Sequence, residues 1–70
     1  MTSIQRIATA VDSLLNGNLA HARESARGLK YYDIFDWLTG PVGWPENRSR
    51  AIADYLIGRI DYRTYCNSDR

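Results

Sequence analysis

Glycines divide this sequence into short segments, and their spacing constrains the fold more than any other feature. Gly17, Gly28 and Gly58 each follow a stretch whose apolar residues recur every three or four positions. That period places apolar side chains on one face of a helix, and glycine is the residue that most often ends a helix. No stretch alternates apolar and polar residues over the length of a strand. The sequence therefore predicts short helices joined by tight turns.

The first thirty residues predict a pair of helices. The first is expected over 4–16, where apolar residues follow one helix face, and Thr2 with Gln5 has the spacing of a capping box. Asn18 is expected to cap a second helix over 19–27, whose apolar face is made of small side chains. Small side chains allow two helices to approach closely. We therefore expect these two helices to form an antiparallel hairpin.

The remaining residues predict two further helices and a short helical turn. A third helix is expected over 31–38, followed by a loop at 39–45 that contains two glycines and two prolines. Proline suits the first turn of a helix, so a fourth helix is expected over 45–57. A last helical turn over 60–66 is expected to be capped by Asp61.

Length and residue counts limit how this chain can be stabilised. Its 70 residues correspond to a single helical domain, 1–70, whose core is marginal at this size. Cys66 is the only cysteine and His21 the only histidine, which excludes an internal disulfide and a Cys/His zinc site. We expect an all-α fold, either a small four-helix bundle or three helices with a short C-terminal helical turn folded back. The expected core residues are Ile7, Val11, Leu14, Leu15, Ala22, Ala26, Ile34, Phe35, Leu38, Ile52, Tyr55 and Leu56.

Aromatic residues are unevenly distributed along the chain. All eight lie between Tyr31 and Tyr65, and the first thirty residues contain none. This half of the chain therefore has aromatic area to spare for a partner, and Trp, Tyr and Arg are enriched at the energetic centres of interfaces. The expected partner-binding residues are Tyr31, Tyr32, Trp37, Trp44, Arg48 and Arg50.

Trp44, in the loop before the fourth helix, has two interpretations. It packs on the next turn and fixes the entry of the chain into that helix, or it projects from the loop and anchors a partner. We favour the first, because a small domain needs its large apolar side chains inside. The same two alternatives apply to the tyrosines Tyr31, Tyr32, Tyr62 and Tyr65.

Two residue pairs could carry chemistry, and for each a structural role is the simpler interpretation. Cys66 and His21 form the only thiol–imidazole pair, but we expect the cysteine to be a small buried apolar residue. Asp33 and Asp36 share a helix face, but the sequence supplies no further ligands for a cation, so we expect a solvated acidic face. We therefore expect no catalytic, cofactor-binding or metal-binding residue, and a protein that is not an enzyme.

A small DNA- or RNA-binding regulator is the alternative function. Arg48 and Arg50 stand at the start of the helix near residues 46–57, where a recognition helix contacts nucleic acid. The loop before that helix is longer than the turn of a standard helix-turn-helix. The formal net charge of +1 also argues against a strongly basic nucleic-acid binder and against an acidic DNA mimic.

Two stretches resemble known classes of protein. Residues 18–26 resemble the second half of a tetratricopeptide-type repeat, but no second copy follows, so we interpret them as an ordinary hairpin of small residues. Residues 43–46 together with 55–66 resemble short proteins encoded by phages and other mobile elements, a class that includes anti-CRISPR and other anti-defence inhibitors. This resemblance of class implies a non-enzymatic protein-interaction module that inhibits a host defence protein.

Hydropathy and cysteine content bear on location and assembly. The sequence lacks the continuous apolar segment of a signal peptide or a membrane-spanning helix, and it has a single cysteine. We therefore expect a cytoplasmic protein that does not enter a membrane. A homodimer is also compatible with the sequence, because the small side chains of 19–27 would let a second copy approach closely.

Overall fold

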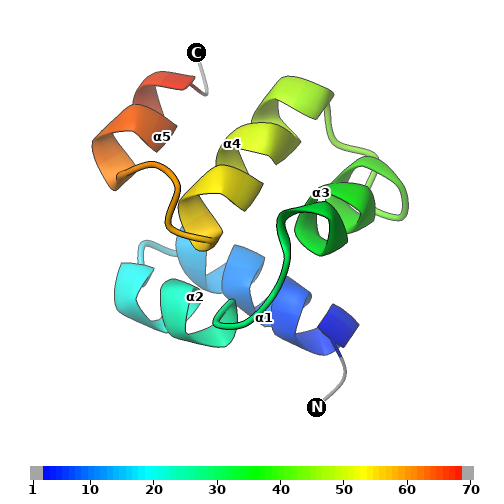
Figure 1. Ribbon diagram of the computed structural model, residues 1–70, viewed down its shortest axis with the longest axis horizontal. Coiled ribbons are helices and arrows are strands. Elements are labelled where there is room, and N and C mark those ends of the chain that lie inside the picture. Colours follow the sequence, from blue (N-terminus) through cyan, green and yellow to red (C-terminus); the bar gives the residue numbers. More distant parts are fainter. Residues whose placement is uncertain (1–2, 69–70) are drawn as a thin grey trace.

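The structure is a computed structural model that describes residues 3–68, and over this range the chain forms helices and no strand. The helices are α1 (Ser3–Leu15), α2 (Leu19–Ser25), α3 (Tyr31–Thr39), α4 (Glu46–Leu56) and α5 (Tyr62–Ser68). The pair α1–α2 forms one layer, and α4 lies over it with α3 on one side and α5 on the other (Figure 1). The all-α fold is confirmed. The expected C-terminal turn is a helix of its own, and Thr2 of the expected capping box lies outside the described residues.

Two of the predicted glycine stops end their helices by the same hydrogen-bonding pattern. After α1, Gly17 has a φ of 83°, and the Asn18 N–H donates to the carbonyl oxygen of Ser13 at 2.8 Å. After α4, Gly58 has a φ of 85°, and the Arg59 N–H donates to the carbonyl oxygen of Asp54 at 2.9 Å. Both are Schellman motifs, in which a left-handed residue lets the chain satisfy the last carbonyls of a helix and turn away.

Side-chain caps begin two of the helices. Asn18 Oδ1 accepts a hydrogen bond from the His21 N–H at 3.3 Å, which caps α2 as predicted. Asp61 Oδ1 accepts one from the Thr64 N–H at 2.8 Å, which caps α5 as predicted. Both caps occupy N–H groups that have no partner inside the helix.

The loop between α3 and α4 is held close to α3 by its backbone. The Trp44 N–H donates to the Leu38 carbonyl oxygen at 2.8 Å, and the Val42 N–H donates to that of Trp37 at 3.2 Å. A Cβ at Gly40 would lie 2.9 Å from the Asp36 carbonyl oxygen, so this position requires glycine. These contacts place Pro45 at the N-cap of α4 and fix the direction in which that helix leaves.

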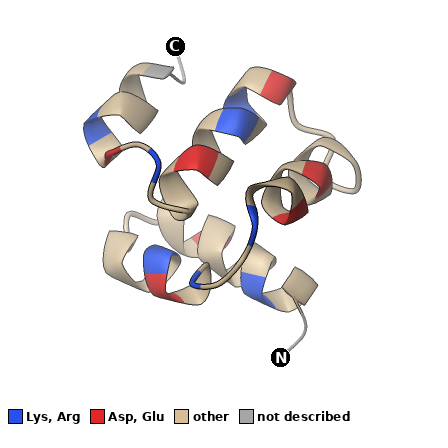
Figure 2. Ribbon diagram, in the orientation of Figure 1, with Lys and Arg blue, Asp and Glu red and all other residues tan. Residues whose placement is uncertain are grey.

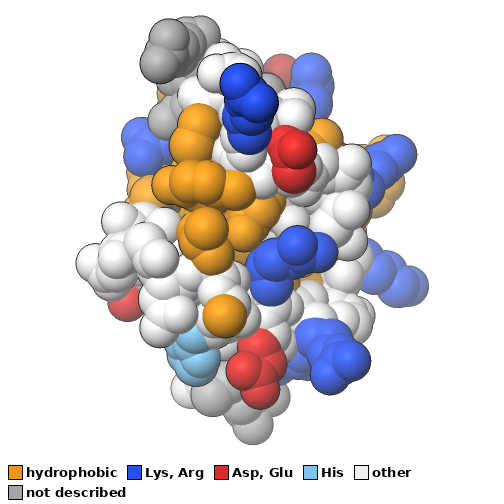
Figure 3. Space-filling view, turned by 90° about the vertical axis from the view of Figure 1, so that its left-hand side faces the viewer, with side chains coloured by type: hydrophobic (Ala, Val, Ile, Leu, Met, Phe, Trp, Pro, Cys, Tyr) orange, Lys and Arg blue, Asp and Glu red, His pale blue; other side chains and the backbone are white. Residues whose placement is uncertain are grey.

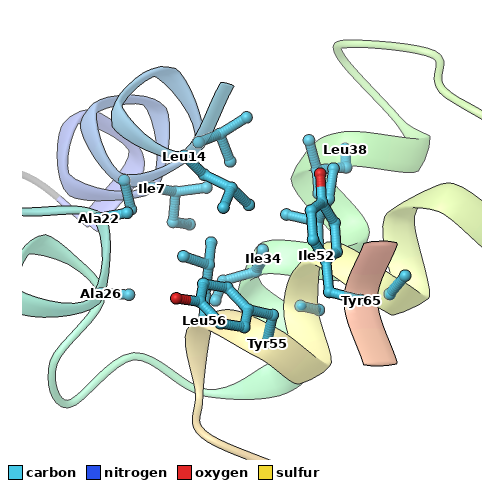
Figure 4. Packing of buried hydrophobic residues seen from close by; sticks show 14 residues of the cluster. Ile7, Leu14, Ala22, Ala26, Ile34, Leu38, Ile52, Tyr55, Leu56 and Tyr65 are labelled. Atoms are coloured by element: carbon cyan, nitrogen blue, oxygen red, sulfur yellow. The ribbon is translucent and has the colours of Figure 1, made fainter. Parts of the chain in front are cut away.

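The core is formed by apolar side chains from every helix (Figure 4). Ile34, Leu38 and Ile52 are completely buried at its centre. Phe35 is half-buried and packs against it. The buried residues are Ile7, Ala10, Val11, Leu14, Ala22, Ala26, Ile34, Leu38, Ala51, Ile52, Ala53, Tyr55, Leu56 and Tyr65. The predicted core is therefore confirmed apart from Leu15 and the half-buried Phe35.

The prediction that Leu15 lies in the core is wrong, since its side chain is 49% exposed. The buried stripe of α1 runs through Ile7, Ala10 and Leu14. Residues at a 3.6-residue period lie within this stripe, whereas Leu15 falls on its edge beside the turn to α2. The apolar pattern alone did not reveal on which side the stripe ends.

The small-residue face of the second helix is used inside the monomer. Ala22 is 0% exposed and Ala26 is 2% exposed, and both belong to the hydrophobic core. This confirms close packing within the α1–α2 hairpin. It also removes the face through which the sequence suggested a homodimer, since these side chains are already covered.

Candidate functional site

Three of the residues predicted to bind a partner, Tyr31, Tyr32 and Arg50, lie together between the start of α3 and the outer face of α4. They line a shallow pocket with a volume of about 480 Å³. A second pocket of about 320 Å³ shares three of these residues and extends the depression along α4 to Asn47. We call this surface the tyrosine–arginine groove, and its residues are Tyr31, Tyr32, Arg50, Asp54, Arg59 and Ile60.

The two tyrosines of the groove differ in how firmly they are held. The Tyr31 ring stacks on Phe35, one helical turn further along, with centroids 5.7 Å apart and an angle of 13° between the rings. Its edge meets Tyr32 at a centroid distance of 5.3 Å. Because Phe35 packs against the core, Tyr31 is anchored, whereas Tyr32 is 71% exposed. The groove therefore presents an exposed ring on a supported aromatic base.

Charge in the groove is unevenly balanced. Arg59 forms an ion pair with Asp54, with Nη1 and Oδ1 3.9 Å apart. Arg50 is exposed and forms no ion pair with any of residues 3–68. Both signs of charge occur along α4 (Figure 2). Two arginines and one aspartate leave the groove with an excess of positive charge.

Trp44 and Arg48, also predicted to bind a partner, form a separate pair at the start of α4. The Arg48 guanidinium carbon lies 4.3 Å from the centroid of the Trp44 ring. Trp44 is half-buried and packs against the core, as the first interpretation of this residue predicts. A cation over an aromatic face is held in place by that face, so Arg48 is engaged within the chain.

Trp37 lies in a third place. It is half-buried and lines a pocket of about 310 Å³ between α1 and α3, together with Ile4 and Pro41. The structure therefore groups Tyr31, Tyr32 and Arg50 and separates them from the other three predicted residues. Helix rotation decides this division, because Trp37 follows Tyr32 by five positions and points to another side of α3.

Three residues of the groove were not predicted to belong to a binding site: Asp54, Arg59 and Ile60. The signal that could have identified them is Gly58. A glycine stop with the Schellman pattern turns the chain back, and its hydrogen bond from Arg59 to Asp54 brings residues 59–60 beside the end of α4.

Cys66 does not have the buried position that the sequence suggested. It is exposed on α5, where it follows Tyr62 by one helical turn. A hydrogen bond with the Cys66 side chain and the charge of that side chain raise the pKa of Tyr62 above its ordinary value of 10.0. Neither Cys66 nor the exposed His21 lines the tyrosine–arginine groove, its extension along α4 or the pocket beside Trp37.

A second exposed apolar area lies on the side of the molecule that α2 and α5 border (Figure 3). Tyr62, at the start of α5, is 42% exposed. Its ring lies 5.8 Å from those of Tyr55 and Tyr65, centroid to centroid. Since Tyr55 and Tyr65 are buried, this cluster of three rings belongs partly to the core and partly to the surface.

Comparison with known proteins identifies no relative. No protein-family model, curated protein or solved structure matches this chain. None of the helices within residues 3–68 is long and apolar enough to cross a membrane. The same residues contain no group of three or more His, Cys, Asp or Glu side chains placed to hold a metal ion. Function is therefore inferred from the geometry of the chain itself.

Proposed function

We propose that this protein acts by binding another protein, without catalysing a reaction, and that the tyrosine–arginine groove is its contact surface. The observation that carries this proposal is the position of Tyr32, which is 71% exposed and lines one pocket with Arg50 and Arg59. Tyrosine and arginine dominate interface energetics, because each combines a large contact area with hydrogen-bonding groups.

The charge of the groove defines the chemistry of the partner. Arg50 has no ion-pair partner among residues 3–68, and the Arg59–Asp54 pair at 3.9 Å is too long and too exposed to be strong. An acidic side chain of the partner would pair with Arg50 while an apolar neighbour packs on the Tyr32 ring. Complementary charge of this kind speeds association and selects against basic partners.

The class of the partner follows from the resemblance of this chain to phage-encoded and mobile-element-encoded proteins. We propose a cytoplasmic host protein, within a defence system, as the target. A module of 70 residues that occupies an acidic segment of such a target would inhibit it by covering that segment. Inhibition would then require one copy of the module for each copy of the target.

Capture of the partner tests this proposal. Immobilised protein is incubated with host lysate, and wild type is compared with the double variant Tyr32→Ala/Arg50→Gln. We expect wild type to enrich a partner and the double variant to weaken its binding about tenfold or more, as loss of interface centres does.

A matched variant removes an exposed ring and an exposed arginine elsewhere. His21→Ala/Arg27→Gln deletes both from α2 and the turn after it, outside the groove. It should retain the partner, provided that circular dichroism shows it folded. Equal retention by both double variants, or equal loss, would exclude the groove as the contact surface.

A single nucleic-acid strand is the second candidate ligand. The observation that favours it is the same exposed ring beside two arginines, because bases stack on tyrosine and phosphates pair with arginine. Of the two arginines at the start of α4, only Arg50 lines the groove, since Arg48 lies over Trp44. Binding of a labelled oligothymidine that falls steeply with salt would support this function, and no binding at low salt would exclude it.

A further inference from the structure

We propose that the pocket between α1 and α3 binds an arginine side chain of a partner protein. We call it the acidic pocket. It has a volume of about 310 Å³, and its lining includes Ile4, Ile7, Trp37, Pro41, Asp33 and Asp36. It lies apart from the tyrosine–arginine groove and shares no lining residue with it.

The base of the acidic pocket is apolar and only partly covered. Ile7 is 2% exposed and belongs to the core, whereas Ile4, one turn earlier, is 60% exposed. Pro41 is brought to this place by the hydrogen bond from the Val42 N–H to the Trp37 carbonyl oxygen, at 3.2 Å. An exposed isoleucine beside a half-buried tryptophan offers apolar area to a ligand.

Two carboxylates line the acidic pocket beside its apolar residues. Asp33 and Asp36 are three positions apart on α3, so they lie on one helix face, and both are exposed. Within residues 3–68 neither forms an ion pair or a side-chain hydrogen bond. Among residues 3–68, the side chains that line the pocket therefore carry negative charge only.

A ligand that satisfies both features has an apolar stem and a cationic head. Basic side chains have this form, because their methylene groups pack on apolar surface while the charged end stays at the edge. Arginine fits better than lysine, since a planar guanidinium with five N–H donors can reach two carboxylates at once and can stack on an indole. Anionic side chains are repelled by the two carboxylates, and neutral side chains leave the negative charge uncompensated.

Peptide titration of the full chain tests this assignment. The probe is a capped peptide Gly-Gly-Arg-Gly-Gly, and the matched probe carries citrulline, which has the same shape without the charge. The readout is the indole N–H signal of Trp37, assigned with Trp37→Phe. We expect a saturable shift with the arginine peptide and about tenfold weaker binding of the citrulline peptide.

Variants connect the shift to the two carboxylates. Asp33→Asn/Asp36→Asn should reduce binding of the arginine peptide to the level of the citrulline peptide. Asp33→Glu/Asp36→Glu retains both charges and should retain binding within a few fold, which separates loss of charge from loss of folding. Asp12→Asn, an exposed aspartate of α1 outside the pocket, should change nothing.

Several results would overturn the assignment. These are equal shifts with both peptides, an unchanged response in the asparagine double variant, or shifts centred on Tyr32 in place of Trp37. A Trp37 signal that moves with protein concentration alone would assign the pocket to a second copy of the chain. Tyr32→Ala/Arg50→Gln should leave the peptide response intact, so failure of the proposed groove and failure of this pocket are distinguishable.

Discussion

Two pairs of helices in this molecule are connected through the same kind of glycine stop, but their contacts use side chains of different size. The first pair, α1 and α2, buries alanines, with Ala10 and Ala22 both 0% exposed. The last pair, α4 and α5, is joined by the rings of Tyr55, Tyr62 and Tyr65, whose centroids lie 5.7–5.8 Å apart. The first pair thus buries alanines from both helices alongside aliphatic side chains, whereas the last pair is joined by large aromatic rings.

The difference shows that a turn motif does not determine what the following helix packs with. Alanines bring two backbones close, and such a contact has no room for added atoms. Rings cover more area at a greater distance, and part of that area stays at the surface, as the 42% exposure of Tyr62 shows. Added side-chain volume in the first pair should therefore lower the free energy of unfolding, whereas in the last pair it is lost volume that should lower it.

The largest effect is expected from Tyr55→Ala. Tyr55 is 3% exposed and its ring contacts those of Tyr62 and Tyr65. Truncation of a buried aromatic residue lowers the free energy of unfolding by about 3–5 kcal/mol, a large part of the stability of a small domain. Denaturant unfolding followed by circular dichroism measures the change.

Tyr32→Ala is the control for this truncation. Tyr32 is 71% exposed, so its loss should change the free energy of unfolding by no more than about 0.5 kcal/mol. If the two variants are equally stable, the tyrosine rings do not hold the last helix pair, and the contrast with the alanine pair disappears.

Ala22→Leu is expected to have the second largest effect. Ala22 is 0% exposed in the core, so three added carbon atoms must displace the neighbouring helix. Overpacking of this kind lowers the free energy of unfolding by about 1–3 kcal/mol. Ala20→Leu, at an exposed position on the same helix, should cost less than about 0.5 kcal/mol. Equal unfolding midpoints for the two variants would show that the alanine contact tolerates added volume.

The smallest expected effect on stability is that of a helix cap. The contribution of the Asp61 cap to α5 depends on pH. Hydrogen bonds from the side chain and the backbone N–H of Thr64 lower the pKa of Asp61 below its ordinary value of 3.8. Since the folded pKa is the lower one, the cap stabilises α5 fully above pH 3.8 and loses this contribution as the pH falls through the folded pKa. Amide signals of residues 62–68 should therefore show fraying of α5 in acid.

The cap of α2 provides the contrast, because Asn18 does not titrate. The amide signals of α2 should not show this acid-dependent fraying. Asp61→Asn keeps an acceptor oxygen for the Thr64 N–H and should remove the pH dependence of α5 while preserving the helix. Persistence of acid fraying in this variant would assign it to another group.

Local features of the fold were predictable from the sequence. Gly17 and Gly58 end their helices, and Asn18 and Asp61 cap the following ones, through hydrogen bonds that span at most five residues. Leu15 was misplaced because its exposure depends on how α1 is rotated against its neighbours. Whether a residue at the edge of the apolar face is buried depends on which side chains pack against it. The apolar periodicity of one helix carries no information about those neighbours.

The candidate site was predictable in part. The residue types predict that Tyr31, Tyr32 and Arg50 bind a partner, and the structure places these three residues in one groove. Trp37 was assigned to the same surface, yet it lines the acidic pocket on another side of α3. The type of a residue indicates whether it is suited to binding a partner. Which of these residues share one surface depends on how the helices are rotated and on the path of the loops.

The order of the helices, the glycine stops after α1 and α4 and the side-chain caps of α2 and α5 follow from the amino-acid sequence alone, because the groups that decide them lie within one or two turns of each other. The tyrosine–arginine groove and the acidic pocket do not follow from it. Each is built from segments far apart in the chain: Tyr32 with Arg59 in one, Ile4 with Trp37 in the other. Such pairs meet only after the helices have packed, when burial of the shared core has determined which side of each helix remains outside.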